Sequence, residues 1–172
     1  MSDLQSLAGK KADAHLQRRI QEVPGAVQAL QRKLAAQGLL QSGAMLKQVL
    51  ATSKEGLQAQ GATTITEYRW AITQSLFASQ SWVEHLIAEA TVSLEPLYNA
   101  YAEQITKAVS VAGVPDVAAR LMAELDQSHS STKNEIALAL RSAFAEKRRG
   151  LLRVLPSAVY RLVAKLLGGG HP

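Results

Sequence analysis

The 172-residue chain contains no cysteine. Disulfides, thiolate catalysis and cysteine-ligated zinc are therefore excluded. No run of about 18 uncharged apolar residues occurs, so a conventional transmembrane helix is not expected. The first residues, Met1 to Gln5, lack the basic and apolar regions of a signal peptide. We therefore expect a cytoplasmic protein, one that could also lie peripheral to a membrane.

Signals for β-strands are also missing. Runs of alternating Val, Ile and Thr do not occur, whereas alanine and glutamine are abundant, and both favour helix over strand. Apolar residues make up 47% of the chain, which is enough to build the core of one domain of this length. The sequence thus predicts an all-α protein with a single helical domain over residues 1–172.

The periodicity predicts an elongated bundle of about five to seven helices. A first helix breaks at Pro24-Gly25, and Gly61 ends a later one. Thr64 and Glu67 have the spacing of a capping box. They would open one long central helix of about seven turns. Apolar residues of this helix recur at Ile65, Tyr68, Ile72, Leu76, Val83, Leu86, Ile87 and Ala90.

The sequence of the second half of the chain predicts further features. Ser93 and Pro96 either kink the central helix or restart it. Beyond them a short heptad seam, a possible coiled coil, runs through Leu94, Tyr98, Tyr101, Ile105, Ala108 and Ala112. Residues 113–116 form a possible internal boundary. Residues 127–131 read as a polar loop, and Thr132 with Glu135 supplies a second capping box.

Few side chains have the spacing of a catalytic or metal site. His85 and Glu89 lie four apart and could share one ion, but a metal site needs more converging ligands. Asp126, Ser128 and His129 are the residue types of a hydrolytic triad, yet they crowd within four positions and no nucleophile elbow surrounds them. We therefore expect no enzymatic activity, no catalytic residue, no metal and no cofactor.

Charge divides the chain into three blocks. Residues 1–40 carry six bases and three acids, residues 41–140 six bases and ten acids, and residues 141–172 seven bases and one acid. The acidic middle could neutralise the ends within one fold or between subunits. The cations expected to meet an anionic surface are Lys147, Arg148, Arg149, Arg153, Arg161 and Lys165.

The C-terminal segment, residues 150–172, is basic and amphipathic. On a helical projection of residues 151–167, the apolar side chains form one broad arc and Arg153, Arg161 and Lys165 lie on the opposite strip. Pro156 disfavours helix at Leu155. The segment could pack on the bundle, lie in a bilayer with its cations on anionic headgroups, or neutralise nucleic-acid phosphates.

These patterns favour a non-enzymatic structural protein that associates through helices with itself or with a larger assembly. Large rings dominate interface energetics, so we expect the partner-binding residues to be Trp70, Phe77, Trp82, Tyr98 and Tyr101. The first alternative is a peripheral protein of a membrane or another hydrophobic surface, which would use the C-terminal helix. The second is non-specific binding of nucleic acid, which is less favoured because few aromatic residues lie near the basic end.

Overall fold

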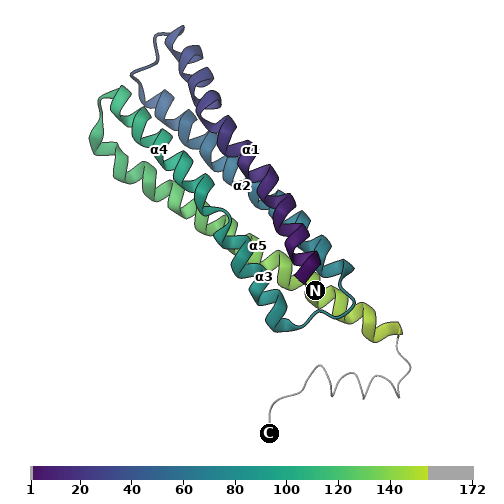
Figure 1. The fold of residues 1–172 in the computed structure, drawn as a ribbon. Helices are drawn as coiled ribbons and strands as arrows, with labels where there is room; N and C mark the ends of the chain where they lie inside the picture. The colour runs from purple at the N-terminus through teal and green to yellow at the C-terminus, as the bar shows by residue number, and fades with distance from the viewer. Residues whose placement is uncertain (1, 155–172) are drawn as a thin grey trace.

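The computed structural model describes residues 2–154, and this part of the chain is built of helices without strands (Figure 1). The all-α class predicted from the sequence is confirmed. The helices are α1 (Ser2–Ala35), α2 (Gly43–Gln74), α3 (Gln80–Val92), α4 (Glu95–Ala112), the short 3₁₀ helix η1 (Pro115–Val117) and α5 (Ala118–Val154).

The helices form an elongated bundle of antiparallel rods (Figure 1). α1, α2 and α5 are one rod each, and α3 and α4 follow each other along the remaining rod. The N-terminus, the α2–α3 turn and the end of α5 lie at one end of the bundle, and the α1–α2 and α4–α5 connections lie at the other. At 1.5 Å per residue, the 34 residues of α1 extend over about 50 Å.

The core consists of two apolar clusters, one toward each end of the bundle. The cluster near the α2–α3 turn includes Ile72, Leu86 and Leu140. The cluster toward the other end includes Leu57, Leu97 and Ile105. Helix α2 contributes to both clusters and packs against all the other α-helices. The apolar face of α2 is therefore buried against the other helices of the same chain.

The prediction of one long central helix that opens at Thr64 is wrong. α2 ends at Gln74, and α3 begins only at Gln80. Ser75 leaves helical geometry with ψ of 135°, and its hydroxyl donates to the carbonyl of Ile72. Ser79 caps α3 by accepting a hydrogen bond from the backbone N–H of Trp82 at 3.2 Å. Serine side chains compete with the helix for backbone partners, and this explains the break.

Three predicted interruptions are absent, so the chain is divided differently from the prediction. Pro24 lies inside α1, and Gly61 lies inside α2, where it is buried against Thr132. Thr64 also lies within α2, so it opens no helix. Residues 127–131 belong to α5, and the Thr132 hydroxyl donates to the carbonyl of Ser128 four residues earlier rather than capping a helix. A Thr followed three residues later by a Glu therefore does not by itself show that a helix begins there, because both residues also fit in the interior of a helix.

Other boundaries agree with the sequence. The helix restarts at Glu95, with Pro96 in its first turn, where a proline needs no N–H partner. The predicted heptad seam faces the core, with Tyr98 and Ala112 only partly buried. α4 ends at Gly113, whose φ of 69° is a left-handed value that glycine adopts without steric cost. The amphipathic pattern predicted after Val154 lies outside the described residues.

Candidate functional site: an apolar and basic end of the bundle

The predicted metal pair, His85 and Glu89, does not assemble a site. Glu89 accepts hydrogen bonds from the Tyr68 hydroxyl at 2.9 Å and from the Gln5 amide at 2.6 Å. His85 is exposed. Burial and the nearby carboxylate raise the pKa of Tyr68 well above its usual range. No group of three metal-ligating side chains converges anywhere in residues 2–154. Glu89, on α3, therefore links this helix to α1 and α2.

The three triad-type residues also stay apart. Asp126 accepts a short hydrogen bond from the Tyr98 hydroxyl. Nε2 of His129 and Oγ of Ser128 are buried without a hydrogen-bond partner among the described residues. The His129 ring stacks on Tyr98 with 4.6 Å between centroids. Burial and, to a lesser extent, Lys133 lower the pKa of His129. A relay needs the base within hydrogen-bond reach of its nucleophile, and this arrangement has no such contact.

Most of the predicted aromatic anchors are engaged within the chain. Tyr101 is buried, and its hydroxyl lies so close to Gly56 that a Cβ there would stand 1.8 Å from it. Trp82 donates its indole N–H to Gln5 at 3.2 Å. The ammonium of Lys11 lies 4.6 Å from the centre of a Trp70 ring. With Tyr98 stacked as described, these rings already contact their own bundle.

Phe77 is the exception among those aromatic residues. It lies in the α2–α3 turn with 76% of its surface exposed, and the preceding Leu76 is 82% exposed. The apolar periodicity predicted Leu76 on the buried face of one continuous helix, but α2 ends at Gln74 and α3 begins at Gln80. The serines at 75, 79 and 81 are the signal that could have identified this turn.

Lys147 fixes the start of this turn. Its ammonium donates to the backbone carbonyls of Ile72 at 2.6 Å and Thr73 at 3.0 Å, to the Ser75 hydroxyl at 3.0 Å and, in a shorter contact, to the Ser75 carbonyl. Unpaired carbonyls at a helix C-terminus carry partial negative charge, which a cation neutralises. Burial lowers the pKa of this lysine. Its ammonium is therefore committed to α2.

The other predicted cations of α5 behave differently. The guanidinium of Arg148 lies 5.7 Å from the Phe144 ring centre. Arg149 is exposed and has no ion pair within residues 2–154. Arg153 belongs to the last turn of α5, and Arg161 and Lys165 lie outside the described residues.

Acidic side chains near this end are already paired. Glu84 accepts two hydrogen bonds from Arg141, at 2.9 and 2.8 Å, and this contact lowers the pKa of the carboxyl. Glu146 pairs with Arg69 at 2.9 Å. Asp3, in the first turn of α1, also has a partner. We call this end of the bundle the apolar–basic end, and define it as Leu76 and Phe77 of the turn with Lys147, Arg148 and Arg149 of α5, of which Lys147 contacts the start of the turn.

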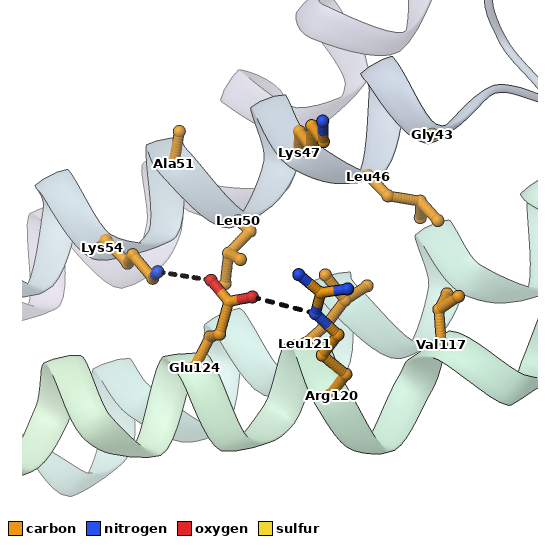
Figure 2. Close-up of a pocket in the computed structure, with 10 residues that line it drawn as sticks. All are labelled: Gly43, Leu46, Lys47, Leu50, Ala51, Lys54, Val117, Arg120, Leu121 and Glu124. Carbon is orange, nitrogen blue, oxygen red and sulfur yellow. Dashed lines mark hydrogen bonds and ion pairs between the residues drawn. The ribbon is translucent and has the colours of Figure 1, made fainter.

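An open groove of about 480 Å³ lies at the opposite end, between the first turns of α2 and α5. Figure 2 shows the carboxylate of Glu124 between Lys54 and Arg120. The distances are 2.9 Å to Lys54 and 3.5 Å to Arg120. The hydrogen bond from Lys54 is the main reason that the pKa of Glu124 is lowered. One carboxylate of the same chain is thus shared by two of the groove's cations and neutralises one of their two charges.

Comparisons with protein-family models, with curated proteins and with solved structures gave no match for this chain. Within the described residues, no helix has the length and apolar character needed to cross a membrane.

Proposed function

We propose that this protein acts by association rather than by catalysis, and that the apolar–basic end is its contact surface. The observation that carries the proposal is the exposure of Leu76 and Phe77, at 82% and 76%. Large apolar side chains that gather on an otherwise polar surface mark sites of interaction. Phe77 is also the one predicted aromatic anchor that remains accessible.

The rest of the described molecule supports association over chemistry. The residues of the two apolar clusters are buried in the bundle. Within residues 2–154, the polar side chains that could have formed a triad or a metal site do not converge. An enzyme site is expected to combine a concave pocket with convergent titratable groups. The groove between α2 and α5 offers one internally paired carboxylate instead.

An apolar dye such as bis-ANS tests the proposal without assuming a partner. The wild-type chain should bind the dye, and the double substitution Leu76→Ser/Phe77→Ser should remove most of the fluorescence gain. Leu138→Ser is the matched control, because Leu138 is 71% exposed on α5, outside the apolar–basic end. Equal dye binding by the double variant and the wild type would contradict the proposal.

Self-association through other exposed apolar side chains is a second candidate function. Leu138 and Val92 are 71% and 65% exposed on α5 and α3, away from the apolar–basic end, and they offer further apolar contacts between copies. Self-association predicts a mass by light scattering that rises above 18.5 kDa with concentration. A mass that stays at the monomer value at high concentration would remove this candidate.

A further inference from the structure

We propose that the partner of the apolar–basic end is the surface of an anionic lipid bilayer. This inference rests on the proposed function and names the partner for the same surface. It is carried by two observations: an exposed apolar pair in the α2–α3 turn, and arginines of α5 that have no acidic partner in residues 2–154.

The apolar pair can enter a bilayer without unfolding the bundle. Leu76 and Phe77 lie in the turn between Ser75 and Ser79, at the end of the bundle where the last turns of α5 run on past this turn (Figure 1). The turn is anchored by Lys147 on one side and by the Ser79 cap on the other. A preorganised contact loses little conformational freedom when it binds. Transfer of both side chains into the apolar layer therefore requires no helix to leave its neighbours.

The charge beside the pair matches anionic headgroups. Arg148 and Arg149 have no acidic partner in residues 2–154, and the nearby Glu84 and Glu146 are paired with other arginines. From residue 148 to the C-terminus the sequence has no acid. The cations of this stretch that belong to α5 are Arg148, Arg149 and Arg153. Cations near an anionic leaflet each strengthen binding by roughly fivefold.

A second copy of the chain fits this surface poorly. Two apolar–basic ends that meet face to face would bring their arginines together, and like charges in an interface oppose association. Two apolar side chains also supply far less than the roughly 800 Å² per partner of a stable protein interface. A bilayer needs no complementary shape and provides the opposite charge.

Cosedimentation of the full chain with vesicles tests the proposal. Binding is expected with mixed phosphatidylcholine–phosphatidylglycerol vesicles and not with phosphatidylcholine alone. Leu76→Ser/Phe77→Ser should weaken binding about tenfold or more, since burial of two large apolar side chains is lost. Arg148→Gln/Arg149→Gln should weaken it by a similar factor, from two lost charges. Thermal unfolding of each variant should verify that it is folded.

Two matched controls distinguish the contribution of the apolar–basic end from that of the rest of the surface. Leu138→Ser removes an exposed apolar side chain elsewhere, and Arg120→Gln removes an exposed cation at the opposite end. Both should bind the vesicles as the wild type does. Vesicle binding that the controls weaken as much as the two double variants would overturn the proposal.

A fluorescence measurement gives an independent readout. In Phe77→Trp, a tryptophan replaces the exposed ring, and its emission should shift to shorter wavelength on addition of anionic vesicles. No shift beyond that of the wild type would contradict insertion of the turn. If dye binding depends on Leu76 and Phe77 while vesicle binding does not, this inference fails and the proposed function stands. If the dye test fails as well, both fall.

Discussion

The two ends of the bundle contain similar residue types but use them differently. At the groove end, Leu46 and Leu121 are buried, and Glu124 pairs with Lys54 and Arg120. At the apolar–basic end, Leu76 and Phe77 face solvent, and the adjacent arginines have no acidic partner in residues 2–154.

The difference shows that composition alone does not define a contact surface. Apolar side chains and cations occur at both ends, but the apolar exposure differs in degree: Leu39, Val111 and Val114 near the groove end are 39–42% exposed, whereas Leu76 and Phe77 are 82% and 76% exposed. Exposed ion pairs contribute little to stability, so the pairing of Glu124 with Lys54 and Arg120 mainly reduces the positive charge of the groove. The following predictions test whether the contrast lies in the surface or also in the core.

The largest expected effects are in the core and should be equal at the two ends. Leu86→Ala truncates the cluster near the α2–α3 turn, and Leu97→Ala truncates the other cluster; both leucines are fully buried. Each should lower the free energy of unfolding by about 2–5 kcal/mol, measured by urea denaturation. A much smaller loss for Leu86→Ala would indicate that the apolar–basic end is loosely packed, and the contrast would then extend to the interior.

Lysines at the two ends should differ in their contribution to stability. Lys147→Met keeps the aliphatic stem but removes the donor to the end of α2, and should cost about 1.5 kcal/mol. Lys54→Met breaks an exposed ion pair with Glu124 and should cost about 0.5 kcal/mol. Chemical denaturation of both variants gives the comparison. Equal losses would mean that the Lys147 cap is no stronger than a surface ion pair.

A smaller, pH-dependent effect should arise between the ends, at His129. Burial holds its pKa below the ordinary histidine value of about 6.5, so protonation favours the unfolded chain. The stability it contributes is complete above the unfolded pKa and declines as the pH falls through and below about 6.5. His129→Phe keeps a ring against Tyr98 but cannot titrate. Thermal unfolding between about pH 7.5 and 5.5 should therefore change less in this variant than in the wild type.

The smallest effect on stability is expected at the contact surface itself. Leu76→Ser/Phe77→Ser replaces two exposed side chains, and the free energy of unfolding should change by no more than about 0.5 kcal/mol. Differential scanning calorimetry checks this. A loss as large as that of Leu86→Ala would show that the turn is part of the core, and its role as a contact surface would be refuted.

The sequence predicted the fold where side-chain periodicity and backbone chemistry agree. The apolar spacing of Leu94, Tyr101, Ile105 and Ala108 identified the buried face of α4, and Gly113 identified its end. Pro96 marked the restart of the helix because a proline fits the first turn.

The failures come from residues whose local preference is overridden by packing. Gly61 disfavours helix by itself, but a Cβ at this position would lie 2.4 Å from the Thr132 methyl group. This glycine therefore allows α2 and α5 to approach closely inside a continuous helix. Pro24 is likewise retained within α1. Such long-range contacts have no signature in a single sequence.

The candidate site was predicted only in part. The basic run at 147–149 and the aromatic Phe77 were both singled out, but their proximity depends on the α2–α3 turn, which periodicity concealed. Lys147 was expected to face an anionic surface, and instead it binds carbonyls 72–75 positions away in sequence. A contact of that range follows from the pairing of α2 with α5 and from no local pattern.

The elongated shape sets how far the molecule would reach from a surface that holds it by one end. A rod whose longest helices extend over about 50 Å and whose contact residues lie toward one end covers an area closer to its cross-section than to its length. The α1–α2 and α4–α5 connections would then lie at the end of the rod that is farthest from that surface. Neighbouring molecules could stand side by side at high density, with the groove between α2 and α5 in their outermost layer.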